Sequence, residues 1–153
     1  MIPKPASCVG CAAYTTSQHW VPDVYVPGSK VLILQGEVSE YEVRGIRVTG
    51  YTGHNQYSTE SYRPSPLNGV DGYELARSYL CLAGLNQDEV SCAAAIRCLT
   101  GLTGKAQQEA ATFCQHTHFH PPQSVELVVA LGPVAAQGMG LEGKIEQWRG
   151  HVL

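Results

Sequence analysis

The feature that most constrains this chain is the placement of its cysteines. A Cys-x-x-Cys pair stands near the start, and two single cysteines follow much later: Cys8 and Cys11, then Cys98 and Cys114. Four thiolates gathered at one place suit either an iron–sulfur cluster or a structural zinc ion, and spacing alone does not separate these two. If the four act together, the chain must fold so that its first segment returns to meet its last third.

The cellular compartment affects how these thiols are interpreted. Residues 1–7 lack the charged and apolar regions of a signal peptide, so we expect a cytoplasmic, reducing location. Six cysteines in such a compartment are more often metal ligands, catalytic groups or buried thiols than disulfides. Cys81 and Cys92 fall within apolar patterns and are predicted to fill the core.

Apolar runs alternate with helix-favouring segments, which predicts an α/β layered domain with a mainly parallel sheet. The expected strands are residues 31–34, 90–96, 125–131 and 145–148. The expected helices are residues 73–83, 105–114 and 135–139. Residues 1–30 and 45–72 are rich in glycine, proline or small polar residues and are predicted to be irregular. Loops that follow the carboxyl ends of parallel strands normally carry the functional site.

Composition narrows the class of partner. Charged residues make up only 15 % of the chain, which indicates a surface partly covered by a partner protein. The formal net charge of −3 argues against strong non-specific binding of duplex DNA by the whole surface, although a local DNA contact stays open. No segment is long and apolar enough to cross a membrane.

The motifs follow one another in a characteristic order. CVGC comes first, then VLILQGE, a glycine-punctuated loop, AAIRC, a helix ending in Cys114, ELVVALG, and a late Arg149-Gly150. This order resembles the iron–sulfur class of the uracil-DNA glycosylase superfamily along nearly the whole chain. The resemblance implies a single three-layer α/β domain over residues 1–153 with a short, mainly parallel central sheet. It also implies a [4Fe–4S] cluster held by Cys8, Cys11, Cys98 and Cys114.

The resemblance also marks positions for base excision. Gly36-Glu37 matches the family's Gly-Glu after the first strand, where the carboxylate would orient water or stabilise a developing positive charge. The family's stacking phenylalanine corresponds to Val48, which has no π face for a base. The family's uracil-reading asparagine corresponds to Ala94, which cannot form hydrogen bonds to a base edge.

The family's late histidine motif is missing, because the chain ends at Leu153 and His151 is too close to Arg149-Gly150 to replace it. We therefore expect a catalytically degenerate iron–sulfur module that acts as a structural or docking component of a larger assembly. One alternative is an active or split glycosylase that uses Glu37. Another is a zinc-stabilised binding protein with a coincidental resemblance.

Two further segments attract attention. His116, His118 and His120 would share one face in an extended stretch and could bind a metal, although a polar helix exit is the plainer interpretation. Residues 53–72 form an insertion relative to the family. Its aromatic residues, interleaved with Arg63, favour a binding role for the insertion, toward nucleic acid or protein.

Overall fold

A three-stranded parallel sheet forms the centre of the described chain. The structure is a computed structural model, and it describes residues 2–17, 19–54 and 56–141. Strand β3 (Val31–Glu37) lies between β6 (Ser91–Ile96) and β7 (Leu127–Ala130), in the order β6-β3-β7. Both neighbours run parallel to β3. The predicted α/β class with a parallel sheet is confirmed, and the three predicted strands in this part of the chain are present.

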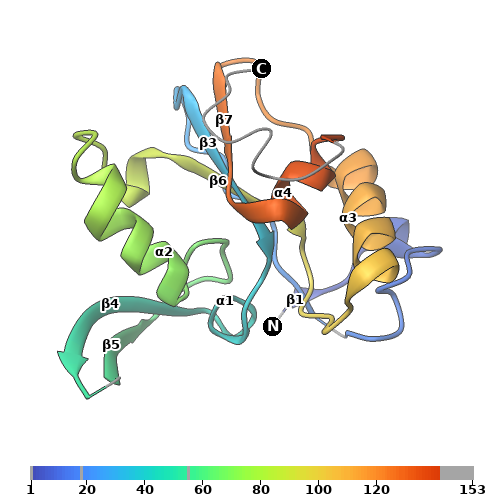
Figure 1. The fold of residues 1–153 in the computed structure, drawn as a ribbon, viewed down its shortest axis with the longest axis horizontal. Helices are drawn as coiled ribbons and strands as arrows, with labels where there is room; N and C mark the ends of the chain where they lie inside the picture. Colours follow the sequence, from blue (N-terminus) through green and yellow to red (C-terminus); the bar gives the residue numbers. More distant parts are fainter. Residues whose placement is uncertain (1, 18, 55, 142–153) are drawn as a thin grey trace.

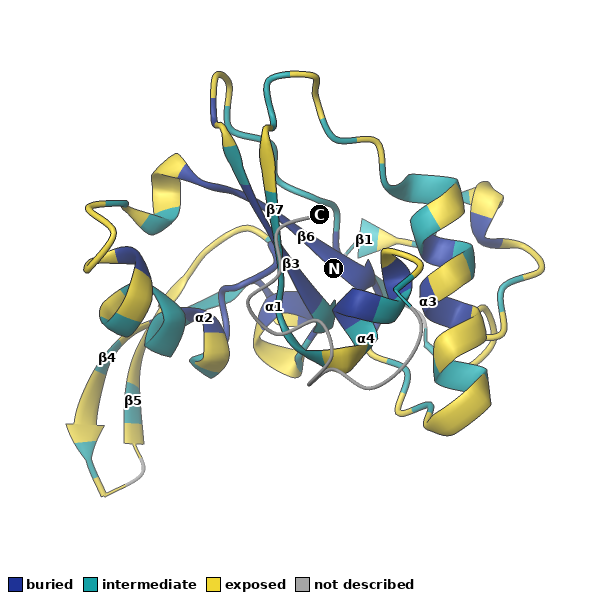
Figure 2. Ribbon diagram, turned by 45° about the horizontal axis from the view of Figure 1, so that its top comes forward, coloured by how far each residue is buried: buried dark blue, intermediate teal, exposed yellow. Residues whose placement is uncertain are grey.

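Helices cover both faces of this sheet (Figure 1). Ile33 of β3 packs with Leu80 on the side of α2 (Val70–Leu75). Its neighbours Leu32 and Leu34 point the other way and pack with Ala135 of α4 (Gly132–Gly138). A central strand buried on both faces explains the continuous apolar run in its sequence. Figure 2 shows the buried residues gathered along β3 and β6.

Helix α3 (Gly104–His118) lies close to β6 because both contribute small residues to the contact. Ala110 and Ala111 of α3 are fully buried against Ala95 and Ile96 of β6. Cys98, just beyond β6, belongs to the same core. The close approach places the two cysteines of the last third, one after β6 and one on α3, on the same side of the sheet.

The N-terminal segment runs along the outer edge of β6. Its short strands β1 (Ile2–Pro3) and β2 (His19–Trp20) pair with each other, and η1 (Ala6–Cys8) is a single 3₁₀ turn. The Val21 amide donates to the Arg97 carbonyl at 2.8 Å, and Val24 forms an antiparallel bridge with Cys92. The segment is therefore mostly irregular, as predicted. It covers the sheet edge and brings residues 8–11 to the carboxyl end of β6.

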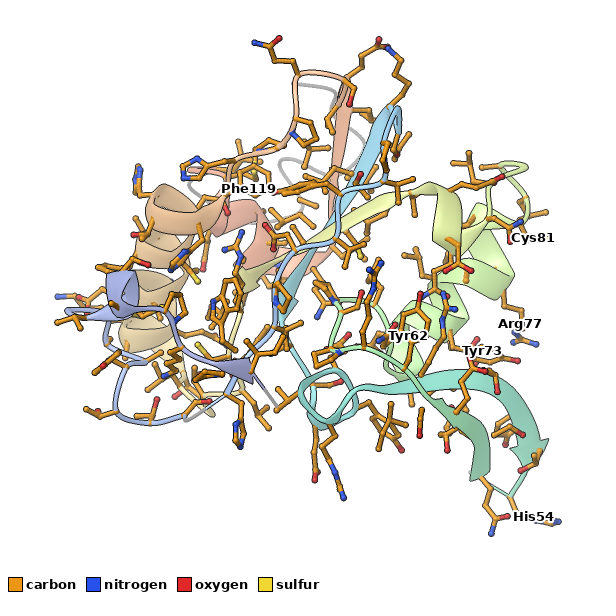
Figure 3. The ribbon with its side chains drawn as sticks, turned by 180° about the vertical axis from the view of Figure 1, so that it is seen from behind. His54, Tyr62, Tyr73, Arg77, Cys81 and Phe119 are labelled. Carbon is orange, nitrogen blue, oxygen red and sulfur yellow. The ribbon has the colours of Figure 1, made fainter. Side chains whose placement is uncertain are left out.

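The prediction that residues 45–72 are irregular is wrong for its first half. Helix α1 (Glu40–Arg44) ends at Gly45, and β4 (Ile46–Gly53) and β5 (Gln56–Ser61) then form an antiparallel hairpin. Tyr51 and Tyr57 face each other across it, with ring centroids 5.3 Å apart. The hairpin projects from the body of the molecule, with His54 near its tip (Figure 3).

Three helices differ from their predicted bounds, and the one expected at 135–139 is α4, which begins three residues earlier. The expected helix at 73–83 begins earlier, as α2, and continues as the π-helical segment η2 (Ala76–Leu80). A short 3₁₀ turn, η3 (Gln87–Glu89), precedes β6. Helix α3 continues past Cys114 to His118, so His116 and His118 lie on its last turn, as expected for a polar helix exit, and the alternative of an extended histidine face is wrong. The expected strand at 145–148, Arg149-Gly150 and His151 lie outside the described residues. No helix in the described ranges is both long and apolar enough to span a membrane.

Candidate metal centre and the neighbouring pocket

The first two cysteines stand at the two ends of a tight turn. Val9 has φ −61° and ψ 127°, Gly10 has φ 97°, and the Cys11 amide donates to the Cys8 carbonyl at 3.1 Å. These angles are those of a type II β-turn, in which the third residue needs a positive φ. Glycine at position 10 adopts that conformation without steric cost. The sequence Val-Gly between the cysteines thus explains why Cys8 and Cys11 are held next to each other.

The other two cysteines come from β6 and α3. Cys98 follows the last residue of β6 by two positions, and Cys114 faces inward from the fourth turn of α3. Cys8, Cys98 and Cys114 are each about 95 % buried, while Cys11 is half-buried. Three separate segments of the chain therefore supply one group of thiols.

The four thiols influence one another's pKa. Burial raises the pKa of Cys98 to about 12, and the thiols of Cys114, Cys8 and Cys11 act in the same direction. Burial also raises the pKa of Cys8, with further contributions from Cys114 and Cys11. The pKa of Cys11 is raised by burial and by Cys114, while a hydrogen bond from the Ala13 amide opposes the shift. The four predicted ligands therefore lie in the same region of the fold, and their binding of one cluster stays a prediction.

Hydrogen-bond donors surround these sulfurs. The Ala13 amide donates to Cys11 Sγ at 3.4 Å, and Arg97 Nη1 donates to Cys114 Sγ at 3.5 Å. His118 Nε2 lies 3.3 Å from Cys8 Sγ, and its ring packs edge-on against Trp20. Such donors suit thiolates, whose negative charge they stabilise.

Trp20 adds a further test of whether a metal group fits here. Its ring packs against the core that contains Cys98, next to Cys11. Its indole Nε1 is buried, and among the described residues no acceptor lies within hydrogen-bond distance of it. A buried donor without an acceptor is costly, and a sulfur bound beside it would accept this hydrogen bond. The residue types gathered here therefore suit a thiolate-bound metal group.

The arrangement does not meet the geometry of a single ion as it stands. Over the described ranges, no group of three or more His, Cys, Asp or Glu side chains is placed so that it could hold one metal ion. Cys81 is exposed and lies beyond α2, on the opposite side of the sheet from α3 (Figure 3), so its predicted place in the core is wrong. Cys92 is buried in the core as predicted, and burial raises its pKa to about 11.

A pocket of about 390 Å³ opens where β3 ends. Gly36 and Glu37, the last two residues of β3, line it, and their predicted roles in substrate binding and catalysis stay predictions. Its other polar walls are side chains of β3, α1 and α2 and the turn before α1, namely Gln35, Ser39, Tyr41, Glu42 and Asp71. With three carboxyl side chains in its walls, the pocket is acidic.

Glu37 is engaged by the chain itself. Its Oε1 accepts hydrogen bonds from the Thr100 amide, from Thr100 Oγ1 at 2.8 Å and from the Gly101 amide at 3.3 Å. Its Oε2 accepts one from Gln107 Nε2 at 3.3 Å. The carboxylate thus ties the end of β3 to the loop that follows Cys98 and to α3.

The two remaining predicted substrate positions do not reach this pocket. Val48 is 3 % exposed on β4, and Ala94 is fully buried on β6 with Val21, Val38 and Val43. Ala94 stands beside Gln35 in the sheet register. Of the residues predicted to bind substrate, only Gly36 lies in the pocket wall.

Three polar residues of this region were missed by sequence reasoning. Gln35 joins β3 to the 65–69 turn, since its Oε1 accepts a hydrogen bond from the Leu67 amide. Its Nε2 also donates a hydrogen bond to the Glu42 carboxylate. Arg97 is 1 % exposed and pairs with Asp23. The signal for Arg97 was a charged residue that directly continues the apolar strand AAAI, where a buried charge requires a partner.

Comparison with known proteins gave no match, either to a protein-family model or to a curated protein.

Proposed function

We propose that this chain is an iron–sulfur module with a glycosylase-like α/β fold, in which Cys8, Cys11, Cys98 and Cys114 hold one [4Fe–4S] cluster. The residues needed for base excision are lost, and the module acts as a structural or docking component of a larger assembly. A DNA-handling assembly is the class that the resemblance suggests. The observation that carries the proposal is that three distant segments supply three buried thiols and one half-buried thiol, with hydrogen-bond donors on the sulfurs of Cys11 and Cys114.

A cluster bound here would supply covalent cross-linking of the three segments and a one-electron redox centre. The chain's own residues would do the rest. The type II turn positions Cys8 and Cys11, and the small side chains of β6 and α3 let Cys98 and Cys114 approach each other. The Ala13 amide and Arg97 donate to two of the sulfurs.

The first test is anaerobic purification, followed by an absorption spectrum and counts of iron, sulfide and zinc on one sample. We expect about four irons and four sulfides per chain and a broad band near the blue end of the visible range. Cys98→Ser should lose most of the iron, while the control Cys81→Ser should keep it, because Cys81 is exposed on the far side of the sheet. A colourless protein with about one zinc ion would favour the zinc alternative.

The proposed loss of catalysis is supported by the pocket. A flipped base needs an aromatic platform and an edge-reading amide, but Val48 and Ala94 lie in the core outside the pocket wall. The acidic wall also repels phosphates. Incubation with uracil-containing single-stranded DNA should release no base above background. Base release that disappears in Glu37→Gln, with the iron content unchanged, would instead establish an active enzyme.

The docking role is supported by two exposed apolar side chains just beyond α2. Tyr79 is 69 % exposed and Leu82 is 87 % exposed, and the chain carries few charges. Light scattering on the purified protein, together with affinity purification from its own cells, tests this role. A folded chain that is monomeric and joins no stable complex would refute it.

A further inference from the structure

We propose that the buried Asp23–Arg97 ion pair sets the reduction potential of the iron–sulfur group, with Asp23 orienting Arg97 toward the Cys114 sulfur. The inference rests on the proposed cluster site and concerns a property of that site. It assigns opposite electrostatic roles to Asp23 and Arg97.

The guanidinium of Arg97 is fixed by three sets of contacts. Its Nε donates to Asp23 Oδ1 at 2.8 Å, and its Nη2 donates to Asp23 Oδ2 at 2.6 Å, which is a bidentate pair. Its Nη1 donates to the Cys114 carbonyl at 3.2 Å and to Cys114 Sγ at 3.5 Å. The carboxylate therefore determines which edge of the guanidinium faces the sulfur.

Burial makes this arrangement costly as a means of stabilising the fold. The side chains of Arg97 and Asp23 are 1 % and 6 % exposed. A buried ion pair gains little net stability, since desolvation offsets its attraction, and apolar residues of similar volume often stabilise as well or better. The Tyr25 hydroxyl donates to Asp23 Oδ2 at 2.9 Å, so the carboxylate is held on a second side too. A specific role for a charge beside the Cys114 sulfur would account for the presence of this pair.

The sign of each contribution follows from the charge change on reduction. The cluster accepts one electron from an added reductant; no covalent bond forms or breaks, and no proton needs to move. Positive charge and N–H donors near the sulfurs favour the reduced form, while negative charge favours the oxidised form. Loss of the Arg97 cation should therefore lower the potential, and loss of the Asp23 charge in Asp23→Asn, whose amide oxygen still accepts from Arg97, should raise it.

The test is a redox titration of wild type, Arg97→Gln and Asp23→Asn, followed by electron paramagnetic resonance with dithionite or a europium(II) chelate as reductant. We expect shifts in opposite directions. Each should change the ratio of oxidised to reduced cluster at fixed ambient potential by about tenfold, which is about 59 mV for a one-electron couple. The matched control is Arg47→Gln, since Arg47 pairs with Asp88 and packs over Tyr62. Its potential should equal that of wild type.

Iron and sulfide counts on the same samples separate two kinds of failure. A wild type without iron would refute the proposed cluster, and with it the basis of this inference. A wild type with a full cluster, and variants whose potentials are unchanged or move together, would overturn the inference alone.

A milder variant covers the case in which Arg97→Gln does not fold. Tyr25→Phe removes only the hydroxyl that donates to Asp23, so the negative charge of the carboxylate is no longer partly offset by that hydrogen bond. This variant should lower the potential, whereas Asp23→Asn should raise it. The ratio of oxidised to reduced cluster at fixed ambient potential should change by less than tenfold. An unchanged potential in both Tyr25→Phe and Asp23→Asn would overturn the inference.

Discussion

Glu37 offers the sharpest test of how this fold is held together, because its carboxylate joins three elements. Among the described residues it accepts four hydrogen bonds, two from Thr100, one from the Gly101 amide and one from Gln107. Glu37→Ala removes all four and leaves two backbone amides without their acceptor.

The magnitude can be worked from these contacts. A hydrogen bond to a charged group contributes about 1.5–3 kcal/mol net, so four would contribute roughly 6–12 kcal/mol if fully buried. Glu37 is only half-buried, and the Gly101 amide is exposed, so water replaces part of what is lost. We therefore expect the free energy of unfolding to fall by about 2–4 kcal/mol. Glu37→Gln should cost less, because the amide oxygen still accepts from Thr100 while the amide nitrogen faces the Gln107 donor.

Urea unfolding followed by far-ultraviolet circular dichroism measures this loss from the shift in midpoint. The matched control is Glu40→Ala, since the exposed Glu40 makes only a surface pair with Arg44 and should change stability by less than about 0.5 kcal/mol. A Glu37→Ala loss below about 1 kcal/mol, or equal to that of the control, would refute the proposed bracing role.

Three further predictions follow from backbone space, burial and titration. In Gly72→Ala the new Cβ would overlap the Leu67 carbonyl oxygen, so the free energy of unfolding measured in urea should fall by more than about 3 kcal/mol. In Gly84→Ala, where φ is 70° and the space around the residue is open, it should fall by only about 1–2 kcal/mol. Iodoacetamide at pH 8 should label the exposed Cys81 of the cluster-loaded protein and should leave Cys92 unlabelled, since burial raises the pKa of Cys92 to about 11. Mass spectrometry measures the labelling, and equal labelling of the two cysteines would contradict this prediction. Burial also raises the pKa of Glu42, so the folded chain binds the Glu42 proton more tightly than the unfolded chain does. The free energy of unfolding should therefore fall as pH rises from 4.5 through the raised pKa. Glu42→Gln, unfolded at the same pH values, should not show this fall.

The sequence predicted the central sheet because its strands carry strong local signals. Apolar β-rich runs marked β3, β6 and β7. The β4–β5 hairpin was missed because glycines at 50 and 53 resemble loop punctuation. In the structure both glycines lie next to register shifts of the hairpin, where a strand tolerates them.

The helix errors have tertiary causes. Nothing local predicts that α3 continues through residues 115–118, but His118 packs against Trp20 and lies beside Cys8, and these contacts hold the last turn. Cys81 was predicted to face the core on a regular helical period. The π-helical segment Ala76–Leu80 has a wider turn, which rotates the following residues relative to that period. The exposure of Cys81 is consistent with this shift.

The candidate site could be predicted only where residue type and spacing coincide. Cysteines are few, and the pair around Gly10 has the sequence of a type II turn, so the thiol group was accessible from sequence. The partner of Arg97 could not be predicted from the sequence, because Asp23 is far away in the chain. Asp23 reaches Arg97 through the segment that covers the edge of β6. The surroundings of a site depend on such long-range pairings, which a single sequence does not specify.

Gly36 and Glu37 are the last two residues of β3, and the contacts of Glu37 connect this strand end to the loop beyond Cys98. Glu37 stands beside Ile96 in the sheet register, so β3 and β6 end at the same level, and Cys98 follows two residues later. The Glu37 carboxylate binds the backbone of Thr100, which fixes the loop that carries Cys98 away from the sheet. A carboxylate at this position is therefore useful for positioning a cysteine even where no base is excised. Val48 and Ala94 lie outside the pocket wall, while the Glu37 carboxylate is bound by the loop beyond Cys98, so the geometry favours a structural role for Glu37.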